Sequence, residues 1–319
     1  MNRKNQKTGK KAGRLSSAGH PLHVHLARLS DALRLPFLMA SLLPAMAAGA
    51  YAWQKGSFDA VDFVLASLAV LLAHAGTNLS NDYYDYQAGN YPQKKNGPTG
   101  GSFAIQQGHY RPAQILGLAV LCFMASLAFF LYLSWSTASL VFPLGLAGIL
   151  LGFFYTAPPL KFGYRLLGEI TTFAGMGPLL FATVYLAAAG ALPDEAGWLL
   201  SIFLGVLVLN VLLAAQVPDI EIDRLSRKRT ISVHWGADAL ANVYGLGSLM
   251  AGLALAGGVL LHGLPPVLLL GLAGLYFSYK AYMELKAERP LAALGLSLTA
   301  LQAGAGIVIL ALLLSVTFV

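Results

Sequence analysis

The chain has 319 residues, of which 57% are hydrophobic and only 11% are charged. Soluble globular domains usually carry about 25% charged residues, so this composition argues against a water-soluble enzyme, a disordered chain and a nucleic-acid-binding module. The single cysteine, Cys122, lies within an apolar run, which excludes a disulfide framework and a thiolate metal site. The composition therefore predicts an all-α, polytopic membrane protein.

The first 27 residues differ in composition from the rest of the chain. They contain six Lys or Arg residues and no acid. Such a segment cannot bury enough apolar surface to fold, so residues 1–27 are predicted to be a disordered basic tail. A cleavable signal peptide would place a short apolar stretch directly behind the charges, whereas here a full-length hydrophobic segment follows later. Residues 28–319 are predicted to form one transmembrane domain that keeps its first helix.

Long apolar segments recur through this domain. A membrane-spanning helix needs about 20 apolar residues. Nine segments approach that length: 33–52, 60–80, 113–134, 137–157, 167–190, 197–217, 239–261, 265–283 and 291–317. An odd number of spans predicts that the two termini face opposite sides of the membrane.

Basic residues are distributed very unevenly between the predicted loops. With the N-terminus inside, 20 of the 21 Lys and Arg residues fall on the cytoplasmic side, and only Lys55 falls outside. Cytoplasmic loops of membrane proteins carry an excess of Lys and Arg. We therefore expect an integral protein of a prokaryotic inner membrane, with its N-terminus and longer loops in the cytoplasm and its C-terminus on the opposite side.

Two clusters of oxygen-bearing side chains occur at the predicted cytoplasmic ends of helices. The second predicted helix ends with four of them: Asn78, Asn81, Asp82 and Asp85. Asn78, Asp82 and Asp85 follow the i, i+4, i+7 spacing that places side chains on one helix face. Near the end of the sixth helix, Asp219 and Asp223 are again four residues apart. The clusters lie four helices apart, which suggests two four-helix units with a ninth helix appended.

A single acid at a membrane boundary is often only a solvated helix end. Four carboxylates in two spaced pairs favour a functional site, because each ionisable residue at membrane depth costs at least about 2.5–3.5 kcal/mol. Facing carboxylates repel unless a cation lies between them. Oxygen ligands without His or Cys are typical of Mg²⁺, which takes its remaining ligands from water and substrate phosphate. The predicted metal ligands are Asn81, Asp82, Asp85, Asp219 and Asp223.

Basic residues in neighbouring loops fit a phosphate-bearing substrate. Four of them are predicted to neutralise a diphosphate: Lys161, Arg165, Arg224 and Lys228. For Arg229 a role in topology is an equal alternative. The histidines supply no predicted site, and His74, one turn before Asn78, is interpreted as a core residue.

Four motifs carry a resemblance to a known family. They are Asn81-Asp-Tyr-Tyr-Asp85, Gly97-Pro-Thr-Gly-Gly-Ser102, Tyr155-Thr-Ala-Pro-Pro159 with Tyr164-Arg165 and Gly168-Glu169, and Asp219-Ile-Glu-Ile-Asp-Arg224 with Lys228-Arg-Thr230. With the nine-helix count, they resemble the UbiA superfamily of intramembrane prenyltransferases over about residues 28–319. Within it the first and third motifs look most like the MenA branch, which prenylates 1,4-dihydroxy-2-naphthoate in menaquinone biosynthesis.

The chain departs from the MenA pattern at two places. Asn90 and Tyr91 stand where that branch often has a further acid, and this leaves the ligands of a second magnesium ion open. Ala215, Gln216 and Pro218 stand where it often has Asn-Asn and Arg, and this leaves the identity of the acceptor open.

The resemblance implies a helical barrel that opens to the bilayer and transfers a polyprenyl group from its diphosphate to an aromatic acceptor, with Mg²⁺ as cofactor. No protein partner is predicted. The catalytic residues implied are Asp82, Asp85, Asp219 and Asp223; the substrate-binding residues are Asn78, Asn81, Tyr155, Lys161, Tyr164, Arg165, Arg224 and Lys228. For the proton that leaves the acceptor ring, Asp82, Glu169 and the diphosphate remain alternatives.

Three other functions compete with this reading. A UbiA-type transferase with another acceptor, such as 4-hydroxybenzoate or homogentisate, would carry the same motifs. A secondary transporter would place its buried acids near the bilayer midplane rather than at one face. A CDP-alcohol phosphotransferase would carry a compact Asp-x-x-Asp-Gly motif, which this sequence lacks.

Overall fold

The computed structural model describes residues 22–89 and 101–315. All regular secondary structure in this part of the chain is helical, which confirms the predicted all-α class. The long helices are α2 (Met39–Gln54), α3 (Ala60–Gln87), α4 (Pro112–Ser136), α5 (Val141–Phe153), α7 (Leu180–Ala189), α8 (Glu195–Gln216), α10 (Ile231–Leu261), α11 (Ala273–Lys286) and α12 (Pro290–Leu314). The other helical segments are α1 (Leu22–Leu33), η1 (Leu35–Leu38), η2 (Phe162–Tyr164), α6 (Gly168–Ala174), which leads through η3 (Gly175–Leu179) into the ten-residue α7, α9 (Ile220–Leu225) and η4 (Pro266–Leu272).

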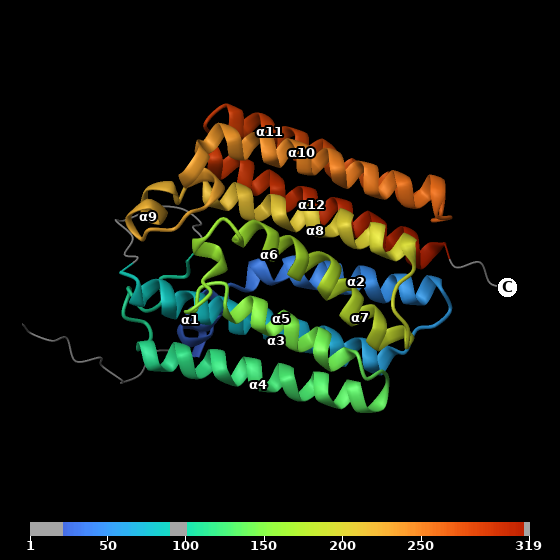
Figure 1. Cartoon of the computed structure of the whole chain (residues 1–319), viewed down its shortest axis with the longest axis horizontal. Helices are drawn as coiled ribbons and strands as arrows, with labels where there is room; N and C mark the ends of the chain where they lie inside the picture. The colour runs from blue at the N-terminus through green and yellow to red at the C-terminus, as the bar shows by residue number, and fades with distance from the viewer. Residues whose placement is uncertain (1–21, 90–100, 316–319) are drawn as a thin grey trace, which may run out of the picture.

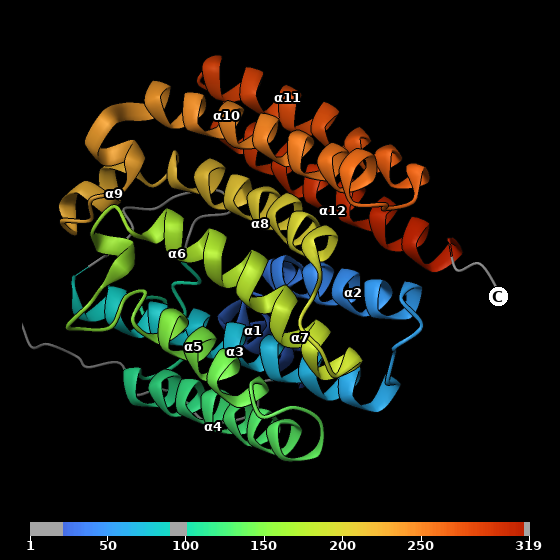
Figure 2. The same ribbon diagram turned by 45° about the vertical axis from the view of Figure 1, so that its right-hand side comes forward.

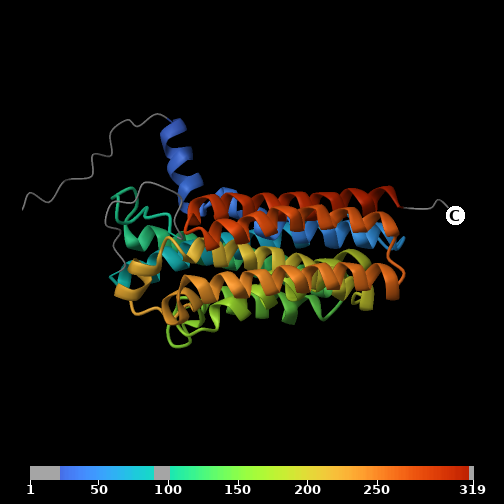
Figure 3. The same cartoon turned by 90° about the horizontal axis from the view of Figure 1, so that it is seen from above.

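The long helices run side by side along one common direction (Figures 1 and 2). The last turns of α3 and α8 lie at the same end of this bundle as α9 (Figure 1). We call this end, which holds Asp82, Asp85, Asp219 and Asp223, the acidic end. α1 crosses the bundle axis near the acidic end, whereas α12 finishes at the opposite end (Figure 3). The two chain ends of the described structure therefore lie at opposite ends of the bundle.

Seven helical segments of the described chain are long and apolar enough to cross a membrane. They are Leu35–Gln54, Ala60–Gln87, Pro112–Ser136, Gly168–Ala189, Glu195–Gln216, Ile231–Leu261 and Pro290–Leu314. The other two predicted spans correspond to α5, which has only 13 residues, and to η4 followed by α11, where a 3₁₀ segment precedes the α-helix. The nine-span count, the barrel and the two four-helix units stay predictions.

Several predicted boundaries differ from the structure. α1 begins at Leu22, so the last residues of the predicted disordered tail are helical, while residues 1–21 lie outside the described residues. α10 begins at Ile231, before the predicted span 239–261. Gly236, whose backbone is non-helical (φ 88°), separates this first turn from the rest of the helix. Residues 90–100, with Asn90, Tyr91 and the first part of the Gly97–Ser102 motif, also lie outside the described structure.

Side-chain caps set the starts of three long helices. Asp59 accepts a hydrogen bond from the backbone N–H of Asp62 at the start of α3, and Asp194 accepts one from Gly197 at the start of α8. Thr230 does the same for Val233 at the start of α10. Such caps satisfy backbone donors that have no partner inside the helix. The polar residues that flank the apolar segments thus define where these helices begin.

Glycines allow two pairs of helical segments to approach closely. A Cβ atom built on Gly177, in η3, would lie 2.6 Å from the Cα atom of Gly205 in α8 and 2.9 Å from the carbonyl oxygen of Ser201. A Cβ on Gly274, in α11, would lie 2.7 Å from the Cα atom of Gly304 in α12. Small residues at such crossings are how membrane helices bring their backbones together.

The crossing of η3 and α8 leads to a test of stability. Gly177→Ala should lower the free energy of unfolding by about 1–3 kcal/mol, because the added methyl group meets backbone atoms that cannot move away. The matched control is Gly295→Ala in α12, where an added Cβ meets nothing within 4 Å. Thermal unfolding of both purified variants in detergent gives the comparison. Equal melting temperatures for Gly177→Ala and the wild type would contradict the close approach.

Candidate active site

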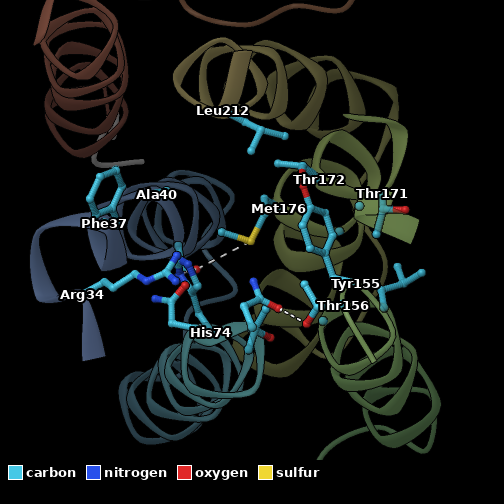
Figure 4. Close-up of a pocket in the computed structure, with 18 of the residues that line it drawn as sticks. Arg34, Phe37, Ala40, His74, Tyr155, Thr156, Thr171, Thr172, Met176 and Leu212 are labelled. Atoms are coloured by element: carbon cyan, nitrogen blue, oxygen red, sulfur yellow. Dashed lines mark hydrogen bonds between the residues drawn. The ribbon is translucent and has the colours of Figure 1, made fainter. Parts of the chain in front are cut away.

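One cavity of about 300 Å³ lies inside the acidic end of the bundle. Its walls come from the α1–η1 connection, α2, α3, α5, α6, η3 and α8, and from the loops around α9. Both acidic clusters line it: Asn78, Asn81, Asp82 and Asp85 from α3, and Asp219 and Asp223 from the start of α9 and from α9 itself. Figure 4 looks into this cavity. The structure thus brings together two clusters that are more than 130 residues apart in sequence.

Asp82 is held by partners from two other segments. Its side chain is nearly buried, at 4% exposure. It forms an ion pair with the guanidinium of Arg34, which precedes η1, and it accepts hydrogen bonds from the backbone N–H (3.2 Å) and the hydroxyl of Ser102. One turn earlier, Asn78 donates to the carbonyl oxygen of Leu33 at 3.1 Å. The start of the domain and the turn at Ser102 are therefore both fastened to α3.

Asp85 lies at the centre of a second network. Its carboxylate accepts a hydrogen bond from the Tyr164 hydroxyl at 2.6 Å and one from the Lys228 ammonium at 3.0 Å. The same ammonium lies 3.4 Å from the carboxylate of Asp223. Lys228 thus bridges the two acidic clusters. Asn81, one turn before Asp85, accepts a hydrogen bond from the Thr156 hydroxyl at 2.7 Å.

Burial and charge act against each other at this bridge. Burial raises the pKa of the Asp223 carboxyl to about 6, and the ammonium of Lys228 opposes this rise without cancelling it. Burial alone would lower the pKa of Lys228, but the carboxylates of Asp85 and Asp223 outweigh burial and raise it above its usual value. Lys228 therefore stays positively charged at neutral pH.

The charges that line the cavity are not balanced. The described lining residues include four carboxylates but only two cationic side chains, Arg34 and Lys228. A diphosphate is itself strongly anionic, so it cannot enter a site with surplus negative charge unless cations enter with it. The donors present are carboxylate and amide oxygens, which suit a hard divalent cation such as Mg²⁺. The residue types at the acidic end therefore fit magnesium.

The carboxylates do not form a complete metal site on their own. Within residues 22–89 and 101–315, no three His, Cys, Asp or Glu side chains converge closely enough to hold a metal ion. Mg²⁺ is usually bound by one or two carboxylates together with waters and substrate phosphates. The arrangement is consistent with metal ions that are completed by a phosphate-bearing substrate.

Three predicted substrate-binding residues lie outside the cavity lining. Lys161 places its ammonium over the ring of Tyr164, 5.1 Å from the centroid. Arg165 is exposed and donates to the carbonyl oxygen of Pro159, and Arg224 is exposed and pairs with Glu221. A direct substrate contact for these three residues stays a prediction. The remaining predicted residues, including Tyr155 and Tyr164, do line the cavity.

The sequence analysis missed several polar residues of the site. Arg34 was counted only as a topology signal, although its guanidinium pairs with Asp82. Ser102 and Thr156 belong to the quoted motifs but had no assigned role. Sequence spacing does not relate Ser102 and Thr156 to α3, because Ser102 lies 20 positions from its partner Asp82 and Thr156 lies 75 positions from its partner Asn81.

Glu169 does not line the cavity. Its carboxylate accepts a hydrogen bond from the side chain of Gln216 at 3.0 Å and from the backbone N–H of Ile231 at 3.1 Å. These contacts join the starts of α6 and α10 to the end of α8. Glu169 therefore positions the helices around the second acidic cluster, and Gln216, one of the departures from the MenA pattern, is its partner.

The inner part of the cavity is largely apolar. Phe37, Met176 and Leu212 face the same opening as Tyr155 (Figure 4). Gly145, Gly148 and Gly152 lie on one face of α5 and also line it. Polar groups therefore gather at the acidic end, while space for an apolar group extends into the bundle.

The bridge through Lys228 leads to a test without substrate. Lys228→Gln leaves Asp85 and Asp223 largely buried without their cation, and breaking such a pair typically costs about 3–5 kcal/mol. We expect a lower melting temperature in metal-free buffer and a larger stabilisation by Mg²⁺ than in the wild type, because the metal ion replaces the lost charge. The control is Lys280→Gln, which lies on the exposed part of α11. An Mg²⁺ response equal to that of the wild type would contradict this role.

Comparison with known proteins identifies the family of this chain. Residues 41–293 match the UbiA prenyltransferase family. The chain is 26% identical over 236 residues to the 1,4-dihydroxy-2-naphthoate octaprenyltransferase of Bacillus subtilis, covering 74% of this chain and 72% of that protein. It is 28% identical over 254 residues to the 2-carboxy-1,4-naphthoquinone phytyltransferase of Synechocystis sp., covering 76% and 78%.

A solved structure shows the same fold. It is a UbiA homologue from Archaeoglobus fulgidus bound to DMAPP and Mg²⁺, with a TM-score of 0.61 and 15% identity, covering 92% of this chain and all of that one. The family match and the apolar helices together identify an integral membrane protein. The chain belongs to the UbiA prenyltransferase family and is an enzyme that transfers prenyl groups.

Proposed function

We propose that this prenyltransferase moves a polyprenyl group from its diphosphate to 1,4-dihydroxy-2-naphthoate, with Mg²⁺ as cofactor. The central observation is that Lys228 bridges Asp85 and Asp223, so both acidic clusters face one cavity and one diphosphate can contact both. The named relatives from Bacillus subtilis and Synechocystis sp. both carry bicyclic naphthalene-type acceptors in their names, and this supports the choice of acceptor.

The proposed metal ligands are the oxygen-bearing side chains at the rim of the cavity. Asp82 and Asp85 with Asn81 or Asn78 would hold one ion, and Asp219 with Asp223 would hold a second. When bound, Mg²⁺ would neutralise the diphosphate and polarise its leaving oxygen. The surplus of carboxylates over cations in the cavity supports this assignment.

Arg34 and Lys228 are proposed to bind the diphosphate. Both now pair with carboxylates that would become metal ligands, and both side chains reach the cavity. Once the carboxylates coordinate cations, the guanidinium and the ammonium become available to the oxygens of the departing diphosphate. Positive charge placed where negative charge develops stabilises a transition state. Tyr164 would keep Asp85 oriented through its hydroxyl.

The apolar part of the cavity is proposed to hold the first isoprene units and the acceptor ring. Breaking the bond between C1 of the prenyl group and the diphosphate oxygen leaves an allylic cation, which water would quench. Apolar walls such as Phe37 and Leu212 exclude water. The ring of Tyr155 can stabilise a nearby cation by about 2 kcal/mol where water is absent. The remainder of the tail belongs in lipid, since each buried CH₂ contributes about 0.8 kcal/mol.

The acceptor ring attacks C1, and its proton must then leave. Glu169, one of three predicted candidates for taking this proton, is engaged with Gln216 and Ile231 and does not line the cavity. This leaves Asp82 and the diphosphate as the groups close to the reacting atoms.

We further propose that the acidic end faces the cytoplasm of a prokaryotic cell. The 20-to-1 distribution of Lys and Arg between the two faces supports this orientation.

Turnover assays test the proposed reaction. Purified protein with a labelled polyprenyl diphosphate and 1,4-dihydroxy-2-naphthoate should release diphosphate only with Mg²⁺ present. Asp82→Asn and Asp223→Asn should each lower kcat/KM by about 100-fold or more, because each removes charge that organises the departing group. Asp238→Asn is the control, since that carboxylate is 88% exposed and pairs with Lys286. Wild-type rates in either cavity variant would contradict the two-cluster site.

The same assay separates the rival functions. Faster turnover with 4-hydroxybenzoate or homogentisate would assign a different acceptor to the same chemistry. Absence of diphosphate release with every acceptor, together with substrate flux into proteoliposomes, would favour a transporter.

The glycine face of α5 leads to a prediction about chain length. A Cβ on Gly148 would meet only Leu179, at 3.9 Å, so Gly148→Phe can fold with its ring in the cavity. We expect kcat/KM for long polyprenyl donors to fall about tenfold or more, since the ring occupies their space, while geranyl diphosphate is affected less. Gly117→Phe on the exposed face of α4 is the control. An equal loss for short and long donors would place the tail elsewhere.

A further inference from the structure

His74 is a polar residue inside the cavity that the proposed reaction does not use. It lies on α3, one turn before Asn78 and two turns before Asp82, on the face that carries the first acidic cluster. Its ring borders the cavity, opposite Tyr155 and close to Met176 (Figure 4). The sequence analysis interpreted it as a core residue, but its position brings it next to the space assigned to the substrates.

A hydrogen-bond chain indicates which ring nitrogen of His74 carries the proton. The Ser41 hydroxyl, on α2, lies 2.7 Å from Nδ1 of His74 and 3.8 Å from Sδ of Met176, in η3. Sulfur can only accept, and the hydroxyl has one proton, so both contacts are hydrogen bonds only when that proton points to Met176 and the Ser41 oxygen accepts from Nδ1–H. In this tautomer Nε2 is unprotonated and offers a lone pair.

This lone pair has no partner within residues 22–89 and 101–315. Among the described residues, the hydrogen bond of His74 is the one at Nδ1, and Nε2 makes none. Because the ring borders the cavity, a donor on a bound molecule can reach this lone pair.

The depth of His74 suits the aromatic acceptor. Eight residues separate it from Asp82, which corresponds to about 12 Å along the helix axis. This length is comparable to a diphosphate and one hydroxylated ring placed end to end. An isoprenoid tail has no hydrogen-bond donor, whereas an aromatic acceptor carries hydroxyl groups.

We propose that Nε2 of His74 accepts a hydrogen bond from a hydroxyl of the aromatic acceptor and so orients the ring toward C1 of the prenyl diphosphate. This inference rests on the proposed function and adds a residue that selects hydroxylated acceptors. Ser41 acts through His74 as a positioning residue, because it holds the ring in the tautomer that accepts.

Two substitutions at His74 separate hydrogen bonding from packing. His74→Phe keeps a planar ring but has no acceptor, whereas His74→Gln places an amide oxygen near the position of Nε2. We expect His74→Phe to raise KM for 1,4-dihydroxy-2-naphthoate about tenfold, equivalent to about 1.4 kcal/mol, with KM for the polyprenyl diphosphate unchanged. In His74→Gln the KM for the acceptor should stay within about threefold of the wild-type value, because the amide oxygen keeps the hydrogen bond, although in an altered geometry.

Ser41→Ala supplies an independent variant. It leaves the ring of His74 in place but frees its tautomer, so KM for the acceptor should rise by a smaller factor than in His74→Phe. His262→Phe is the matched control, because it makes the same substitution at an exposed histidine after α10 that does not line the cavity. Size-exclusion profiles in detergent verify that every variant is folded.

Equilibrium binding of 1,4-dihydroxy-2-naphthoate, without Mg²⁺ and without donor, gives a second measurement. The Kd should rise about tenfold in His74→Phe and little in His74→Gln. An unchanged acceptor KM and Kd in His74→Phe, with normal wild-type turnover, would overturn this inference and leave the proposed function intact. Wild-type protein that prenylates no acceptor would instead overturn the proposed function, and failure to bind any hydroxylated ring would overturn both.

Discussion

The pairing of Lys228 with Asp85 and Asp223 is the interaction on which the site depends. Carboxylates within a membrane-embedded bundle are costly, and two of them from different helices repel each other unless a cation lies between them. Lys228 supplies that cation, 143 residues away from Asp85 in sequence. Arg34 pairs with Asp82 in the first cluster. Lys228 therefore joins the two clusters, Arg34 joins the first cluster to the start of the domain, and the two cations hold the loops of the acidic end around one cavity.

The cavity combines two environments that the chemistry of prenyl transfer requires together. Oxygen ligands and cations at the rim suit a metal-bound diphosphate, and the apolar interior suits an allylic chain and its cation. The glycine face of α5 leaves space in this interior. Glu169 fastens α6, α8 and α10 at the same end without entering the cavity. The apolar interior and the polar rim therefore belong to one cavity.

Particular residues show how far sequence reasoning reached. Asp82, Asp85, Asp219 and Asp223 could be singled out because charges in an apolar chain are rare, and helical spacing placed them on shared faces. Lys161, Arg165 and Arg224 carry the same charge as Lys228, but they do not line the cavity. Their contacts in the folded chain are not visible from their spacing in the sequence. His74 was interpreted from the sequence as a core residue, but it lines the cavity. Its contact with Ser41 joins two helices, and only the folded chain shows that it borders the cavity.

Composition and periodicity by themselves determined that this chain is helical and belongs in a membrane, because apolar length and the placement of Lys and Arg are local properties. They also determined which carboxylates stand at helix ends. Tertiary structure alone decided that Arg34, Ser102 and Lys228 meet those carboxylates, which polar groups face the cavity and which face solvent. The reason is physical: a hydrogen bond or an ion pair acts over a few ångströms in space, and residues that meet at this distance can be separated by any length of chain.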